Sequence, residues 1–326
     1  MGETMSYKTK AFASIAGILL IIGLAAITGI FLYESGSKSQ ATTGGAAVRS
    51  ADTFSGGTFE ASGVAQVPGT DSVLFVDDGK PGEVHWMRLD REGKQSGSIK
   101  PINLGVNIED LEGITTDGTY FYVVSSQSKS KSAEQVGLAR FKLNVETGSV
   151  ADVQSLSELK RFLVENVAEL RSFGSKKAKD DGINIEGLSW DPAHGRLLLG
   201  LRSPVAEGNA LLVPLKLRDP RGPFSFENIE AQGASAIRLP LGGLGIRGIE
   251  YDERHGLFHI IAGATENQDK TDFKLWEWGG ESNNPQLREV TTFDRKLKPE
   301  GVAPASAGGS SFKFVVFDSS KYLRIQ

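Results

Sequence analysis

The chain has 326 residues, a formal net charge of −4 and no cysteine, a length that suits one large domain or two ordinary ones. The lack of cysteine excludes disulfides, thiolate metal sites and thiol nucleophiles within this sequence. The mild acidity, without a basic stripe interleaved with aromatic residues, gives no reason to expect a nucleic-acid partner.

The N-terminal segment predicts a membrane anchor. Residues 1–10 precede an uncharged apolar run at residues 11–33, and a helix of that length spans a hydrocarbon core of roughly 30 Å. Lys8 and Lys10 before the run favour a cytoplasmic N-terminus. The body is then expected in the periplasm or outside the cell. A cleaved signal peptide is the alternative, but its apolar core normally holds only about 7–15 residues.

A flexible linker is expected next, because residues 34–52 are rich in Ser, Gly, Ala and Thr and lack apolar periodicity. The globular body follows over residues 53–326. Glycine is abundant there and spread out, which indicates many turns and therefore many short strands.

One short phrase recurs five times in the body: a charged residue, a glycine and an apolar β-former. The phrase stands at residues 60–65, 111–115, 185–189, 246–250 and 299–303. A turn and a strongly apolar run follow each copy, which is the order of inner strand, turn and second strand in a propeller blade. The sequence therefore predicts an all-β, five-bladed β-propeller.

The closure of the ring can be predicted as well. The fifth repeat ends after three strands, so we expect residues 53–59 to supply its outer strand and remove an open sheet edge. A six-bladed ring is the alternative if residues 214–239, or the region around the helix described next, hide a degenerate blade.

An inserted amphipathic helix is predicted over residues 155–173. Leucine and valine recur there at spacings of three and four, which is typical of one helix face. We expect this face to pack on the sheets, and a partner-binding helix is the alternative. The apolar positions are Leu156, Leu159, Leu163, Val167 and Leu170.

The stretches at residues 110–114, 184–189 and 196–204 resemble the bacterial DUF3616 family of uncharacterised proteins. Residues 60–110 are also similar to the SdiA-regulated and phytase-like propeller families, with a Leu-Phe-Val-Asp-Asp strand at residues 74–78. The resemblance implies a β-propeller outside the cytoplasm. The phytase-like name implies ester or phosphoester hydrolysis, but no matching catalytic set carries over to this sequence.

The residue before each repeated glycine is charged in most copies, and the inner strands of a propeller surround its central channel. We therefore expect these side chains to converge at one mouth of the channel. Two residues before their glutamates stand an aspartate and an asparagine, and an arginine after the second strand of the third blade adds an anion contact. The candidate ligand-binding set is Glu60, Asp110, Glu112, Asn184, Glu186, Arg202, Arg247 and Glu300.

Two interpretations of this mouth remain open. Its carboxylates suit Ca²⁺, which takes six to eight oxygen ligands at about 2.3–2.6 Å, with Glu112, Glu186 and Glu300 as the metal ligands. Alternatively, the glutamates accept hydrogen bonds from the neighbouring blade and lock the ring, while the glycines let backbones approach closely. Arg247 favours a mixed-charge network.

We therefore expect a membrane-anchored, extracytoplasmic propeller that acts as a ligand-binding, protein-binding or scaffold module. Its partners would be the membrane, through the N-terminal helix, and a protein or a small anionic ligand at the mouth. The alternative is a calcium-dependent hydrolase of phosphoesters or esters. Calcium is the one cofactor candidate, and no catalytic residue is identified.

Overall fold

The computed structural model describes residues 47–128, 135–231, 235–268 and 271–326. The predicted membrane anchor at residues 11–33 and most of the predicted linker lie outside these residues. No helix within the described ranges is long and apolar enough to cross a membrane. The described residues belong to one compact unit.

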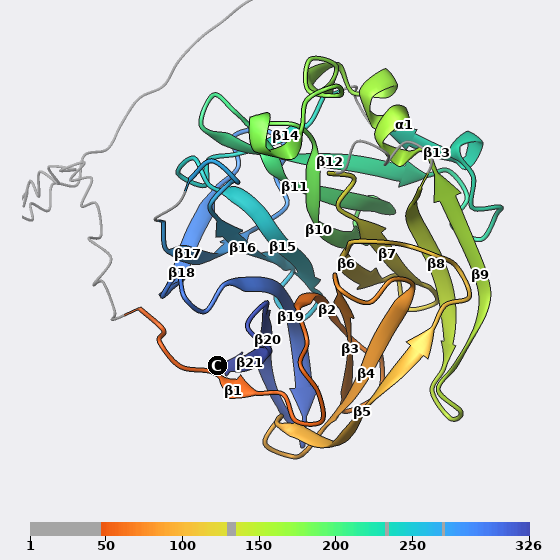
Figure 1. The fold of residues 1–326 in the computed structure, drawn as a ribbon, viewed down its shortest axis with the longest axis vertical. Helices are drawn as coiled ribbons and strands as arrows, with labels where there is room; N and C mark the ends of the chain where they lie inside the picture. The colour runs from red at the N-terminus through yellow and green to blue at the C-terminus, as the bar shows by residue number, and fades with distance from the viewer. Residues whose placement is uncertain (1–46, 129–134, 232–234, 269–270) are drawn as a thin grey trace, which may run out of the picture. The chain divides into compact units, whose positions relative to one another are not determined.

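Five antiparallel sheets form a ring in the described part of the chain, and we number them as blades 1 to 5 in sequence order (Figure 1). Blades 1 and 2 hold β2 (Ala61–Gln66), β3 (Ser72–Asp77), β4 (Glu83–Leu89), β5 (Gln95–Asn103), then β6 (Leu111–Thr116), β7 (Phe121–Ser125), β8 (Val136–Asn144) and β9 (Ser149–Ser157). Blade 3 holds β10 (Asn184–Asp191), β11 (Arg196–Ala206), β12 (Asn209–Leu217), β13 (Ile229–Ala231) and β14 (Ile237–Leu239). Blades 4 and 5 hold β15 (Gly245–Asp252), β16 (Leu257–Gly263), β17 (Phe273–Trp278), β18 (Leu287–Phe293), then β19 (Pro299–Ala307), β20 (Ser310–Phe317), β21 (Lys321–Ile325) and β1 (Asp52–Thr53).

The inner strands β2, β6, β10, β15 and β19 contact one another in this order, and β19 also contacts β2, so the ring is closed. Buried apolar side chains of the described residues gather in five clusters, one at each junction between neighbouring blades. The repeated apolar runs therefore supply faces for blade-to-blade packing, which confirms the predicted five-bladed propeller.

The outer strand of blade 5 comes from the N-terminal side, as predicted, but lies earlier in the sequence. Asp52 pairs with Tyr322 and Thr53 with Lys321, whereas the prediction placed the strand over residues 53–59. The chain leaves the sheet after Thr53 because Phe54 turns into the junction between blades 5 and 1. Its ring lies 5.1 Å from that of Tyr322 and stacks at 5.0 Å on another core ring, that of Phe75.

Residues 214–239 do not hide a sixth blade. The strand β13 pairs with β12 at residues 215–217, and β14 pairs with the other end of β12 at residues 210–212. The two short strands together form the outer edge of blade 3.

The inserted helix is shorter than predicted. Helix α1 spans Leu159–Asn166 and is followed by a 3₁₀ turn, η1, at Ala168–Leu170. Residues 155–157 instead belong to β9, because β8 offers their backbone groups ladder partners. All five positions of the apolar stripe are buried in the core between blades 2 and 3, so the expected packing face is confirmed. Further 3₁₀ turns lie at η2 (Ala178–Asp180) and η3 (Phe226–Asn228).

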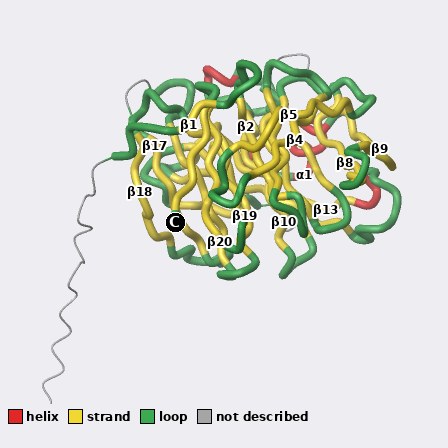
Figure 2. Tube along the Cα trace, turned by 90° about the horizontal axis from the view of Figure 1, so that it is seen from below, coloured by secondary structure: helices red, strands yellow, loops and turns green. Residues whose placement is uncertain are grey.

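The strands run between two loop-bearing ends of the ring (Figure 2). We name these ends by the inner strands. The bulge end is where the inner strands begin, at the β-bulges described below. The turn end is where they finish and the chain turns into the second strand of each blade.

Candidate functional site

Each inner strand carries one extra residue where the repeated phrase meets its glycine. The pairing register shifts by one residue between Leu111 and Gly113, and an equivalent shift occurs in the other four blades. A β-bulge of this kind re-aims the bulged side chain. In blade 1 the shift lies between Ala61 and Val64, so Ser62, rather than the predicted Glu60, stands directly before the bulge glycine.

The bulge glycines join neighbouring blades. A Cβ atom on Gly248 would lie 2.4 Å from the carbonyl oxygen of Glu300, and one on Gly301 would lie 2.7 Å from that of Ser62. Such backbone contacts leave no room for a side chain. The space enclosed by the bulge residues is only about 10 Å³, enough for about one water molecule. The channel is therefore narrow at the level of the bulges.

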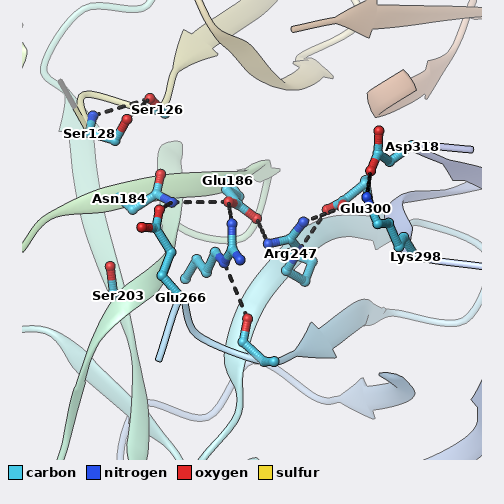
Figure 3. A network of polar contacts seen from close by, with 12 residues as sticks. Ser126, Ser128, Asn184, Glu186, Ser203, Arg247, Glu266, Lys298, Glu300 and Asp318 are labelled. Atoms are coloured by element: carbon cyan, nitrogen blue, oxygen red, sulfur yellow. Dashed lines mark hydrogen bonds and ion pairs between the residues drawn. The ribbon is translucent and has the colours of Figure 1, made fainter. Parts of the chain in front are cut away.

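Arg247 lies between two of the predicted glutamates (Figure 3). Its Nε donates to Glu300 Oε2 at 2.6 Å, and a second nitrogen pairs with Oε1 of the same carboxylate. Its Nη1 lies 2.9 Å from Glu186 Oε2, an ion pair without the angles of a hydrogen bond. Since the three residues are only 3–8% exposed, their charges depend on one another rather than on water.

Glu186 is the centre of a second set of contacts. Arg202 Nη1 donates to Glu186 Oε1 at 3.0 Å, and Arg202 Nε donates to the Ala264 carbonyl at 3.2 Å. Asn184 Nδ2 donates to the same Glu186 oxygen at 3.1 Å and lies 3.5 Å from Glu266 Oε1. The loop after β16, which brings Ala264 and Glu266, carries no repeat signal in the sequence.

Two further predicted residues stand apart from Arg247. Glu112 makes no ion pair within the described ranges, and burial, followed by the charges of Glu186 and Glu300, raises its pKa well above the usual value. Asp110 instead accepts hydrogen bonds from the hydroxyls of Ser126 and Ser128 at the end of β7. Six of the eight predicted residues thus lie in or beside one network, whereas Asp110 turns toward its own blade.

The eighth residue, Glu60, lies in a separate group of carboxylates in blade 1. Its carboxylate and those of Asp77 and Asp78 place ligand oxygens within 4.8 Å of one another. Burial, then the charge of Glu60, raises the pKa of Asp78 to about 7. Glu60 itself is exposed.

The three glutamates proposed as calcium ligands do not form an oxygen cage. The guanidinium of Arg247 occupies the place between Glu186 and Glu300, and Ca²⁺ binds through oxygen atoms only. A calcium ion at these glutamates would have to displace a paired guanidinium. The calcium-dependent hydrolase reading therefore gains no support from this network.

A cavity of about 550 Å³ lies at the turn end of the channel. All five blades line it, at the ends of their inner strands and in the turns that follow. Its walls include Gln66, Thr116, Trp190, Glu250, Tyr251 and Pro304. None of the predicted site residues lines this cavity.

Two acids in the cavity wall are buried, Asp252 at 2% exposure and Glu250 at 7%; Asp252 is paired with Arg254, whereas Glu250 has no ion-pair partner within the described residues. The hydroxyl of Thr115 donates to Glu250 Oε1 at 2.8 Å and accepts from the Trp190 backbone N–H at 3.0 Å. The contact crosses the channel from blade 2 to blade 4. Among the described residues, Glu250 Oε2 is buried and has no hydrogen-bond partner. Burial raises the pKa of Glu250 well above its usual value, against the smaller opposite effect of Thr115.

A pattern other than the charged residue before each glycine points to Glu250 in the sequence. Glu250 stands two positions after its bulge glycine. The other repeats place a small residue at this register position and leave space in the channel for one long side chain. These residues are Ala65, Thr115, Ser189 and Ala303.

A family model described as "Protein of unknown function (DUF3616)" matches residues 139–324. No curated protein matches the chain. Among solved structures, a glucose dehydrogenase has a TM-score of 0.45 at 12% identity, over 85% of this chain and 99% of that one. A luciferin-regenerating enzyme has a TM-score of 0.42 at 10% identity, over 85% of this chain and 79% of that one. The periplasmic gluconolactonase PpgL of Pseudomonas aeruginosa has a TM-score of 0.39 at 14% identity, over 81% of this chain and 71% of that one. At such scores, no activity is transferred from these proteins.

Proposed function

The chain belongs to the DUF3616 family, whose description states no activity, and we therefore propose a function from the site itself. The protein is a membrane-anchored, extracytoplasmic β-propeller that works as a ligand- or protein-binding module. The binding site is the cavity at the turn end. The apolar run at residues 11–33 supports the anchored placement.

The observation that carries this proposal is the cavity of about 550 Å³ whose lining includes Glu250, a buried glutamate with one unpartnered carboxyl oxygen. Ligand pockets are typically about 300–1,000 Å³ and combine apolar walls with a few convergent polar groups. Leaving a buried polar atom unpaired costs about 1–3 kcal/mol. A ligand that pairs with Glu250 Oε2 recovers that free energy.

The bulge end has a different role in this proposal. Arg247 forms ion pairs with both Glu186 and Glu300, and the space enclosed by the bulge residues beside them is only about 10 Å³. We assign this network to holding blades 3, 4 and 5 in register. Recognition is left to the turn end, where all five blades present side chains to one space.

Two neighbouring serines of β20 provide the test. Ser311 lines the cavity and Ser310 does not, and both are exposed. A library of small amines, acids and sugars is screened by saturation-transfer NMR against the full chain in detergent. We expect Ser311→Trp to abolish the binding of the compounds that the unmodified protein selects, and Ser310→Trp to retain it. Retained binding in Ser311→Trp, or a library without any binder, contradicts the proposal.

A further inference from the structure

We propose that the turn-end cavity selects a cationic group, an alkylammonium, whose charge is held by Glu250. The inference rests on the proposed binding function and specifies its ligand class. It follows from the charges of the cavity wall, from the chemistry of its apolar surfaces and from the unpartnered oxygen of Glu250.

The cavity wall is acidic. It contains a single basic residue, Arg254, whose Nε lies 3.1 Å from Asp252 Oδ1. The same Asp252 also contacts the rings of two histidines outside the lining. Three further carboxylates in the wall have no ion-pair partner within the described ranges: Asp71, Asp117 and Glu253. Together with the buried carboxyl group of Glu250, they make the wall unfavourable for an anionic ligand and attractive to a cation.

The apolar part of the wall suits a short alkyl chain. Trp190 and Tyr251 are among the residues that line the cavity, and prolines line it from three blades. A cation near an aromatic face gains about 0.5–2 kcal/mol from the ring quadrupole. Trp190 is held in place because its ring stacks on Tyr122, with centroids 6.2 Å apart and the planes inclined by 2°.

Glu250 couples binding to proton release. Burial raises the pKa of Glu250, and because Thr115 already donates to Oε1, Oε2 is the oxygen that carries the proton whenever Glu250 is protonated in the empty cavity. An arriving ammonium group donates a hydrogen bond to Oε2 and pairs with the carboxylate, so the carboxyl proton leaves to solvent. One cation enters and one proton departs, and the charge balances.

This coupling fixes the pH dependence. The affinity for the ammonium group should rise about tenfold per pH unit while Glu250 is protonated in the empty protein, and level off above its pKa. Strands β10 and β19 contribute Trp190, Pro304 and Ser306, none of which titrates in this range. The charged or titratable groups around Glu250 on the remaining elements are Asp71, Asp117, Asp252, Glu253, Arg254 and His259.

The test is isothermal titration calorimetry of the full chain in detergent at pH 6, 7 and 8, with n-butylamine as the probe. Butyrate and pentan-1-ol have similar size with opposite or no charge. A capped Gly-Lys-Gly peptide presents the same ammonium group as a protein partner would. We expect n-butylamine, the peptide or both to bind, with proton release and an affinity that rises with pH as long as Glu250 is protonated in the empty protein. Binding by the amine alone identifies a free ligand as the source, and binding by the peptide alone identifies a partner's lysine.

Glu250→Gln should lower the affinity at pH 8 at least tenfold and remove the proton release. Glu146→Gln, in an exposed turn at the rim of blade 2, should change neither. If Glu250→Gln does not fold, Ser311→Trp against Ser310→Trp provides the same comparison. Preferential binding of butyrate or pentan-1-ol, lost in Ser311→Trp, overturns the cation inference but leaves a binding site. Failure of every probe here and of the whole library overturns both.

Discussion

Charged residues stand at four of the five bulge positions, and their partners decide what each one can do. Glu186 and Glu300 form ion pairs with Arg247, whereas Glu112 makes no ion pair within the described ranges and feels Arg247 only as a smaller effect that lowers its pKa. The repeat pattern predicted that these side chains converge. It could not predict which of them pair, because pairing depends on small differences in the distances between side chains near the ring axis. It also depends on Arg202, which comes from the second strand of blade 3.

The role of Glu250 could not be predicted from the sequence for a similar reason. In the sequence, Glu250 is simply the last residue of the fourth copy of the repeated phrase. Its role depends on Thr115 from two blades away, whose hydroxyl donates a hydrogen bond to it across the channel, and the sequence does not show this contact. Comparing the small residues at its register position would have singled it out.

Arg247→Met should lower the free energy of unfolding by about 3–5 kcal/mol, because Glu186 and Glu300 would remain buried without compensation. Urea denaturation of the full chain in detergent measures this loss. Arg288→Met is the control, since Arg288 pairs with Glu277 but keeps a side chain that is 71% exposed. A loss below about 1 kcal/mol in Arg247→Met would show that the network does not hold the blades together.

Glu112 should make stability depend on pH. Its pKa is raised in the folded protein above the ordinary value of 4.5, so the folded state binds the proton more tightly than the unfolded chain. Stability is then highest below about pH 4.5 and falls as the pH rises toward the raised pKa, by up to about 1.4 kcal/mol per pH unit.

Glu112→Gln cannot ionise and should reduce this decline, so its advantage over the unmodified protein should grow between pH 5 and pH 8. Chemical denaturation at several pH values measures both curves. Parallel curves for the two proteins would refute the assignment of a raised pKa to Glu112.

At the scale of the element, the glycine-centred bulge is the unit that repeats. The repeated glycines were visible in the sequence, and close backbone contact at them was one of its two interpretations, because a glycine is kept in every copy. The bulges themselves were not predicted and follow from the register shifts. The helix was predicted too long, since Leu156 fits both a helical stripe and the alternation of β9. Only the ladder with β8 decides between the two.

Gly301→Ala should destabilise the protein by about 1–3 kcal/mol, as overpacking does, because its Cβ would lie 2.7 Å from the Ser62 carbonyl oxygen of the adjoining blade. Gly279→Ala is a matched control, since its Cβ would meet the end of the exposed Glu281 side chain, which can move away. Thermal unfolding compares the two variants. Equal melting temperatures would argue against the close junction between blades 5 and 1.

At the scale of the whole molecule, the ring closes through β1. The number of blades and the source of the closing strand followed from counting strands per repeat. The position of β1 did not, because the burial of Phe54 and Phe59 draws the chain away from the sheet directly after Thr53.

Removal of residues 2–53 should expose the edge of β21 and lower the melting temperature, with aggregation through the open edge. Removal of residues 2–46 should leave the ring intact, because Asp52 and Thr53 remain to pair with β21. Light scattering during a thermal ramp reports both effects. Equal behaviour of the two truncations would show that β1 contributes nothing to closure.

The same truncation at residue 46 also tests the anchor. The full chain should stay with membranes after an alkaline wash, whereas the truncated chain should be released, because the apolar run at residues 11–33 is absent from it. Recovery of the full chain in the wash would contradict a spanning segment.

The central claim is that the turn-end cavity binds a ligand over Glu250. The most direct measurement is the calorimetric titration of n-butylamine into Ser311→Trp and Ser310→Trp, side by side at pH 8. We expect Ser310→Trp to bind one amine and Ser311→Trp to bind none. Equal binding by the two variants would contradict the claim, because the two serines neighbour each other on β20 and only Ser311 lines the cavity.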